Sequence, residues 1–235
     1  MARLDDLTKT TEEILSTTWE VRDGNVIPET EDLALKNGAV KIEATFLYAD
    51  LAGSSKLAQK CPWETTAKII RAYLDICIRL IKIHGGVIRS FDGDRVMGIF
   101  KGSTPNTDAT NCAREIDWMV ENILNPKAKE KFKSIKDNDI KITHCVGVDT
   151  GIARAVRAVI RNSNDLIWIG EAPSFSAKLS DLREYPYTIY ITKACYNKLP
   201  DTSKKNASGD IWELRSFSFA GESKDVYRTQ HFLKP

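Results

Sequence analysis

The chain has 235 residues, of which 34 are basic and 32 acidic, so its formal net charge at neutral pH is only +2. This length is sufficient to bury a full core within one elaborated domain, or one domain with a small appendage. The near-neutral charge gives no electrostatic reason to expect a nucleic-acid or membrane partner, and it is typical of a soluble enzyme.

The cysteines and the start of the chain indicate a cellular compartment. The five cysteines are widely spaced and form no CxxC pair, so we expect free thiols in a reducing environment. No basic region followed by an apolar stretch opens the chain, and no run approaches the roughly 20 apolar residues that a membrane span needs. We therefore expect a cytoplasmic protein.

The N-terminal segment predicts an appendage to a main domain. Residues 4–17 have apolar side chains at helical spacing and predict a short amphipathic helix. Residues 19–36 are interrupted by Asp23-Gly24-Asn25 and by Pro28, which predicts an extended, turn-rich arm. We accordingly expect an N-terminal helix and arm over residues 1–38 and the main domain over 39–235.

The next segment predicts a strand, two helices and a hairpin. Residues 39–50 alternate with period two but are apolar on both sides, which predicts a strand buried on both faces. A short helix should run from Gly53 to Lys60, and a longer one should follow and end at Gly85-Gly86. The stretches 87–91 and 95–100 then predict a hairpin around Asp92-Gly93-Asp94.

The second half of the chain adds strands to the predicted sheet. A helix is expected over 108–124, and the polar run 125–139, which contains five lysines, is expected to be a solvated linker. The remaining expected elements are strands at 140–149 and 188–191, an extended pair at 153–160 and 162–169 about a polar turn, a helix from Pro173, and a closing hairpin of 211–219 and 226–232. This order predicts an α/β (α+β) fold with a mixed, mostly antiparallel sheet and helices packed against it.

Two aspartates, Asp50 and Asp94, carry the functional signal. Each alone has an ordinary structural role, because an aspartate at a strand end commonly caps a helix and one in a glycine turn commonly forms an Asx-turn. Together they stand at a strand end and at a hairpin tip, where two carboxylates can meet across neighbouring strands. Converging carboxylates favour a hard divalent cation between them, so the pair predicts a metal site.

These residues also carry a resemblance to a family. The chain from about Lys41 to Ile191 resembles class III nucleotidyl cyclases, and within them the bacterial pyrimidine cyclases of Pycsar anti-phage defence. The resemblance rests on Leu47-Tyr48-Ala49-Asp50-Leu51-Ala52, Phe91-Asp92-Gly93-Asp94-Arg95 and Asn164-Asp165-Leu166-Ile167-Trp168-Ile169-Gly170, together with the arm at 19–33 and Val226-Tyr227-Arg228-Thr229.

The resemblance implies a fold, a metal set and an assembly. The fold would be a ferredoxin-like βαββαβ palm with added elements, working as a head-to-tail homodimer whose two active sites each contain residues of both subunits. Asp50, Asp94 and the Leu51 carbonyl would bind two Mn²⁺ or Mg²⁺ ions per site, and the substrate 3′-hydroxyl would attack the α-phosphorus and release pyrophosphate.

Departures from the family pattern bear on specificity. Purine-using relatives commonly carry polar, base-reading residues where this chain has Ser90 and Ile167, which disfavours adenylate cyclase activity. The family's ribose-binding Asn and phosphate-binding Arg correspond to Ser174 and Lys178. Lys178 keeps a positive charge without the planar fork of arginine, and Ser174 is a shorter hydrogen-bonding substitute.

Other residues are candidates for nucleotide contacts. Gly53, Ser54 and Ser55 would offer backbone N–H groups to the triphosphate, although an ordinary helix start explains them equally well. Tyr48 shares the strand side of Asp50 and would pack against the base, and Arg89 and Arg95 flank the hairpin near base or phosphate.

The resemblance thus implies a pyrimidine cyclase that converts UTP to 3′,5′-cyclic UMP, a product that a separate effector protein would read. Cytidylate cyclase activity on CTP stays open, and so does a catalytically silent, nucleotide-sensing module, which the changes at Ser174 and Lys178 would suit. A palm-type polymerase shares the two-carboxylate chemistry, but the near-neutral charge argues against a template groove.

Overall fold

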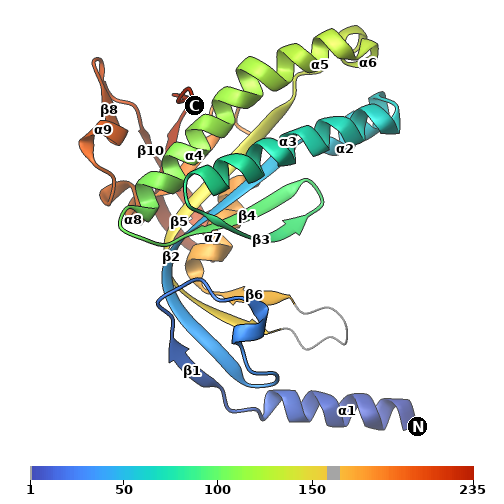
Figure 1. Ribbon diagram of the computed structural model, residues 1–235, viewed down its shortest axis with the longest axis vertical. Helices are drawn as coiled ribbons and strands as arrows, with labels where there is room; N and C mark the ends of the chain where they lie inside the picture. The colour runs from blue at the N-terminus through green and yellow to red at the C-terminus, as the bar shows by residue number, and fades with distance from the viewer. Residues whose placement is uncertain (1, 158–164) are drawn as a thin grey trace.

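The computed structural model describes residues 2–157 and 165–235 of the chain, and its main feature is one large sheet (Figure 1). The strands follow the order β10-β11-β7-β5-β2-β4-β3, while β1 pairs with β2 and β6 with β5. Their bounds are β1 Glu20–Asp23, β2 Gly38–Ala52, β3 Val87–Asp92, β4 Arg95–Phe100, β5 Thr143–Arg157, β6 Leu166–Ile169, β7 Ile189–Thr192, β10 Glu213–Phe219 and β11 Glu222–Thr229. A separate small pair consists of β8 Lys205–Asn206 and β9 Gly209–Asp210.

The expected mixed, mostly antiparallel sheet is confirmed. Only β1 with β2 and β5 with β7 pair in parallel among the described strands. The neighbours β5-β2-β4-β3, connected through helices and one hairpin, reproduce the βαββαβ order of a ferredoxin-like palm. The polar turn expected between 153–160 and 162–169 lies outside the described residues.

Two long strands form the axis of the molecule. β2 and β5 pair antiparallel over nearly their whole length, from Ala39 with Val156 to Ala52 with Thr143. At one end they lie in the middle of the main sheet, and at the other they extend away from it as an arm that β1 and β6 flank (Figure 1). Their burial on both sides at the sheet centre explains the continuous apolar sequence of β2.

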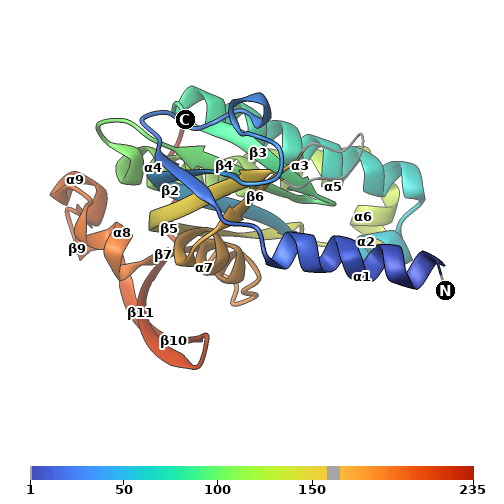
Figure 2. The same ribbon diagram turned by 90° about the horizontal axis from the view of Figure 1, so that it is seen from below.

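Helices cover both faces of the sheet. One face packs against a layer that runs from α2 to α6 and encloses the larger core, whereas α7 packs on the opposite face (Figure 2). The helices are α1 Ala2–Leu15, α2 Ser54–Lys60, α3 Trp63–Ile83, α4 Pro105–Met119, α5 Asn125–Lys131, α6 Lys133–Asp137, α7 Glu171–Ser180, α8 Lys193–Asn197 and α9 Asp201–Lys204, with a 3₁₀ turn at Thr30–Asp32 and a π-helical turn at Val120–Leu124.

A glycine lets α7 approach the sheet closely. A Cβ atom built on Gly147 of β5 would lie 2.1 Å from the carbonyl oxygen of Ser176 and 2.7 Å from the Ser180 amide nitrogen, both in the backbone of α7. The helix therefore rests directly on the strand backbone, and a side chain at Gly147 would push it away from the sheet.

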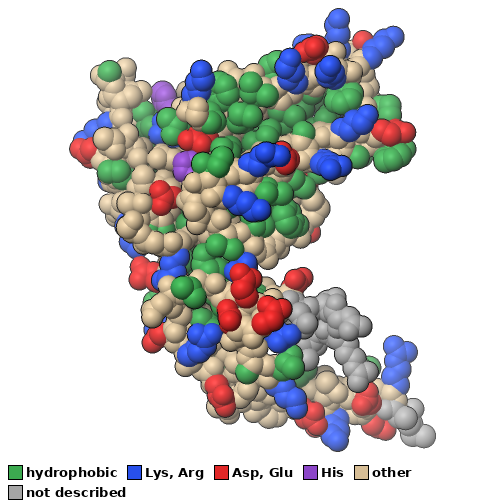
Figure 3. Space-filling model, viewed as in Figure 1, with side chains coloured by type: hydrophobic (Ala, Val, Ile, Leu, Met, Phe, Trp, Pro, Cys, Tyr) green, Lys and Arg blue, Asp and Glu red, His purple; other side chains and the backbone are tan. Residues whose placement is uncertain are grey.

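Two expectations were wrong. The separate segments expected at 140–149 and 153–160 are joined in one strand, since β5 runs unbroken over Thr143–Arg157. The run 125–139 is not a linker but continues α4 through the π-helical turn into α5 and α6. Ala128 and Ile135, seven residues apart, are buried among lysines that point outward, and the five lysines concealed this sparse apolar spacing in the sequence. Figure 3 shows Lys and Arg side chains gathered over this end of the molecule, with acidic side chains among them.

The N-terminal segment has the expected helix and extended arm. α1 is exposed along its length, and β1 adds to the edge of β2. The boundary between residues 1–38 and 39–235 stays a prediction. All five cysteines are buried as free thiols. Within residues 2–157 and 165–235, no helix combines the length and apolar character that crossing a bilayer requires.

Candidate active site

The register of β2 and β4 brings the two aspartates to neighbouring positions. Asp50 pairs with Arg95, the first residue of β4, and Asp94 directly precedes Arg95 in the hairpin turn. Burial raises the pKa of Asp50, and the nearby charge of Asp94 raises it further, whereas the guanidinium of Arg183 opposes both. The strand register therefore places the two aspartates at neighbouring positions, as the sequence analysis expected, while their role as metal ligands stays a prediction.

The oxygen atoms at this position suit a hard divalent cation. Oδ2 of Asp94 is buried and finds no hydrogen-bond partner among the described residues. Such an orphaned carboxylate oxygen is costly unless a cation or proton satisfies it. The Leu51 side chain belongs to the core, so only its backbone carbonyl is available as a ligand. In the part of the chain that the structure describes, no group of three or more His, Cys, Asp or Glu residues forms an alternative metal site.

Two arginines surround the aspartates, and sequence reasoning missed one of them. Arg95 donates to Asp92 at 2.9 Å and to Asp181 at 3.3 Å, and its guanidinium lies 5.7 Å from the centre of the Tyr48 ring. Arg183 donates to Oδ2 of Asp50 at 2.5 Å. Asp181 is the residue that caps the C-terminal end of α7, and Arg183 follows two residues later. Both are far along the chain from the aspartate motifs, and no local pattern marks them.

Helix α7 presents Ser174 and Lys178 on its exposed side. Ser174 donates its hydroxyl to the carbonyl of Gly170 at 3.0 Å, one turn earlier in the helix. The Lys178 ammonium lies 3.6 Å from Asp181, and its side chain is 64% exposed. Within one subunit, Asp181 thus links Lys178 to Arg95, while both α7 side chains remain accessible to a second molecule.

The remaining candidates are placed differently. Gly53 adopts a left-handed conformation (φ 74°) before α2, so Ser54 and Ser55 supply the first amides of a short helix next to the end of β2. Arg89 is directed to the N-terminal arm, where it contacts Glu29 at 2.8 Å. Ile167 is half exposed on β6 and pairs with Val156 in the extended arm of the sheet. Of the predicted contacts, Arg95 therefore stands beside Asp50 in the strand register and Tyr48 lies next to Arg95, whereas Arg89 has another partner.

Comparison with known proteins shows to which family this chain belongs. No family model matches the chain. A uridylate cyclase of Rhodovulum sp. (strain MB263) is 43% identical over 233 residues, which covers 98% of this chain and 97% of that protein. A uridylate cyclase of Burkholderia cepacia is 39% identical and covers 90% of this chain and 91% of that protein.

The chain belongs to the uridylate cyclase family. The crystal structure of the guanylyl cyclase Cya2 superposes with a TM-score of 0.63 over 80% of this chain and 91% of that one, at 16% identity. This chain therefore has the class III cyclase fold, and the ferredoxin-like palm that the resemblance implied is confirmed.

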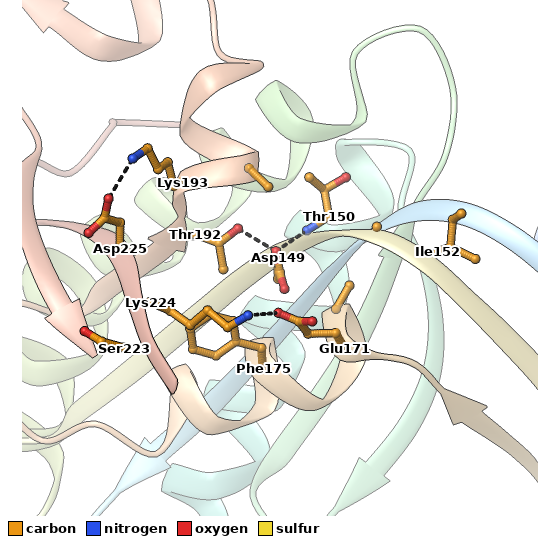
Figure 4. A pocket seen from close by; sticks show the side chains of 13 residues that line it. Asp149, Thr150, Ile152, Glu171, Phe175, Thr192, Lys193, Ser223, Lys224 and Asp225 are labelled. Carbon is orange, nitrogen blue, oxygen red and sulfur yellow. Dashed lines mark hydrogen bonds and ion pairs between the residues drawn. The ribbon is translucent and has the colours of Figure 1, made fainter. Parts of the chain in front are cut away.

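This member of the uridylate cyclase family also has a polar cavity outside the aspartate cluster. The cavity of about 510 Å³ lies between the first turns of α7, the end of β7 and β11 (Figure 4). At its floor Asp149 accepts hydrogen bonds from Thr192 and from the Thr150 amide, while Lys224 pairs with Glu171 at 3.1 Å on its wall. Burial raises the pKa of Asp149 to about 6, so this carboxyl is expected to influence stability through pH.

Proposed function

We propose that this protein is a cyclase that converts UTP to 3′,5′-cyclic UMP and pyrophosphate. The observation that carries the proposal is the 43% identity with a uridylate cyclase over 98% of the chain. The neighbouring positions of Asp50 and Asp94 support it, because phosphoryl transfer depends mainly on positioning and charge stabilisation and needs few catalytic side chains.

Asp50, Asp94 and the Leu51 carbonyl would hold two Mn²⁺ or Mg²⁺ ions. The buried, unsatisfied oxygen of Asp94 and the all-oxygen donor set fit such ions. When bound, the ions would supply positive charge that favours ionisation of the ribose 3′-hydroxyl and neutralises the triphosphate. The protein contributes position: Tyr48 and Arg95 line the approach to Asp50, and the amides of Gly53, Ser54 and Ser55 offer donors to phosphate oxygens.

The preference for a pyrimidine base would follow from the absence of the polar, base-reading side chains that purine-using relatives carry at two positions. Ser90 and the apolar, half-exposed Ile167 stand where purine-using relatives commonly place base-reading groups. A purine would leave its polar edge unpaired there, whereas a smaller pyrimidine can be held by fewer contacts. CTP is the nearest competing substrate, and Arg89 would reach the base only if it left Glu29.

Two subunits would complete each active site. Ser174 and Lys178 lie on the exposed side of α7, where they can reach a nucleotide bound to a partner's aspartates in a head-to-tail homodimer. Lys178 would stabilise charge on the transferring phosphate, and Ser174 would contact the ribose. Mixing inactive Asp50→Ala with the slower Lys178→Ala should then raise activity above that of either variant alone, because the mixed dimer contains one intact site. Activity that does not rise on mixing would contradict shared sites.

The substrate test uses purified protein with each of the four NTPs and Mn²⁺. We expect pyrophosphate release and a cyclic product from UTP, with CTP next, and no turnover in the Asp50→Ala variant although its circular dichroism is unchanged. Binding of a nucleotide without pyrophosphate release would instead favour the silent sensing module, which the hydrogen bond of Ser174 to its own helix would suit.

The biological setting that we propose is anti-phage defence in the bacterial cytoplasm. The cyclic nucleotide would serve as a second messenger for a separate effector protein. The resemblance of the motifs around Asp50 and Asp94 to pyrimidine cyclases of such systems supports this setting. Expression of the protein with its candidate effector should protect cells from phage, and the Asp50→Ala variant should not.

A further inference from the structure

Arg183 holds the carboxylate that the proposed metal site requires. Its Nη2 donates to Oδ2 of Asp50, and its Nη1 donates to the carbonyls of Ser180 and Leu182 at 2.7 and 2.8 Å. The Asp50 side chain is only 13% exposed, whereas that of Arg183 is 41% exposed. The guanidinium therefore covers the carboxylate from the solvent side, and two backbone carbonyls hold it at the edge of the site.

The two carboxylates are satisfied unequally. Arg183 neutralises Asp50, but Oδ2 of Asp94 is buried and has no hydrogen-bond partner in the described parts of the chain. A guanidinium donates hydrogen bonds in one plane and cannot be deprotonated in proteins. Arg183 therefore occupies a lone pair that Asp50 could otherwise use to coordinate a metal ion. Cation binding at this pair consequently requires Arg183 to move or to share Asp50.

The neighbouring arginine is in a different situation. Arg95 contacts two carboxylates, Asp92 and Asp181, which do not belong to the proposed metal ligands. Among the described residues, Asp50 is the one carboxylate that pairs with Arg183. If Asp50 turns to a cation, Arg95 keeps its partners, whereas Arg183 loses its counter-charge while its backbone contacts keep it at the site.

We propose that Arg183 exchanges partners during loading: it neutralises Asp50 in the empty site and passes to the triphosphate of the substrate when Asp50 takes up the metal. The inference rests on the proposed function and adds a specific phosphate-binding residue to it. A triphosphate beside the two aspartates offers the anionic oxygens that a guanidinium binds through paired hydrogen bonds. The exchange also protects the empty site, because Asp50 is not left as a partly buried, unpaired charge.

The experiment measures Mn²⁺ binding without nucleotide, from the electron paramagnetic resonance signal of free Mn²⁺. Removing the competing charge in Arg183→Gln should tighten Mn²⁺ binding by about tenfold, whereas Arg183→Lys, which keeps the charge, should stay within about twofold of the wild type. At saturating Mn²⁺ the KM for UTP of Arg183→Gln should rise by about tenfold, because the phosphate contact is lost. Arg79→Gln is the matched control, since it removes an Arg–Asp pair on the exposed surface of α3 and should change neither quantity.

The outcomes separate this inference from the function on which it rests. Asp50→Asn should lose Mn²⁺ binding, and the metal assignment then holds. In that case, an unchanged Mn²⁺ affinity or an unchanged KM for UTP in Arg183→Gln overturns only the proposed exchange of partners. If Asp50→Asn binds Mn²⁺ as tightly as the wild type, the metal assignment fails as well. Thermal unfolding of each variant shows whether the protein is folded. If Arg183→Gln is not folded, Arg183→Met, which also removes the charge and should give the same two changes, provides the test.

Discussion

Replacing Gly147 by alanine should damage both stability and activity, because this glycine is where α7 contacts β5. The new Cβ would lie 2.1 Å from the Ser176 oxygen, 2.7 Å from the Ser180 nitrogen and 2.7 Å from Cβ of Leu179. Two of these three atoms belong to the helix backbone, so no change of side-chain rotamer relieves the overlap. The helix must move away by about 1 Å to reach ordinary contact distances.

The expected cost follows from overpacking in a dense interior. Such insertions typically cost about 1–3 kcal/mol, and we place this one at the upper end, near 3 kcal/mol, because backbone atoms are involved. For a chain of this size that corresponds to a fall in Tm of roughly 6–12 °C. Since α7 carries Ser174 and Lys178 and leads directly to Arg183, turnover should fall even at temperatures where the variant is folded.

Urea unfolding followed by circular dichroism measures the stability, and pyrophosphate release measures turnover. Gly151→Ala is the matched control, because it lies on the same face of β5 and its new Cβ would meet only Cβ of Ala172, at 3.4 Å. That variant should stay within about 1 kcal/mol of the wild type. Equal unfolding midpoints for Gly147→Ala and the wild type, or equal losses for the two variants, would refute the reasoning.

Three further predictions follow from individual side chains. Burial raises the pKa of Asp149 from 3.8 to about 6, so the folded state binds this proton more tightly than the unfolded state does. The resulting contribution to the free energy of unfolding is complete below about pH 4 and is lost as the pH rises through 6. Asp149→Asn should therefore gain stability relative to the wild type between pH 4 and 7, by at most about 3 kcal/mol, and a difference that does not vary with pH in urea titrations contradicts the assignment. Lys178→Ala should lower kcat by about 10- to 100-fold with a smaller change in KM, and an unchanged kcat removes it from the mechanism. EDTA should abolish turnover and added Mn²⁺ should restore it, whereas turnover that survives thorough chelation contradicts the metal assignment.

The sequence and the structure agree best where local patterns are strong. The apolar run of β2 and the Asp92-Gly93-Asp94 turn identified two elements whose pairing brings Asp50 and Asp94 together. The helix starting near Pro173 was also expected, and α7 begins at Glu171. Over residues 125–139 the spacing of apolar residues did not predict the helices that are present. Two buried apolar residues among five lysines are too sparse a pattern, and tertiary packing stabilises these helices.

By itself, the sequence determined the elements of the palm and its two aspartates, because hydrophobic period and turn chemistry are local properties of the chain. Only the tertiary structure decided which charges meet: Arg183 reaches Asp50 across 133 positions of the chain, Arg95 joins Asp92 and Asp181, and Arg89 pairs with the arm through Glu29. The partner of a charged side chain depends on how helix and sheet pack, and that packing is set at contacts such as the one at Gly147, which no local pattern reports.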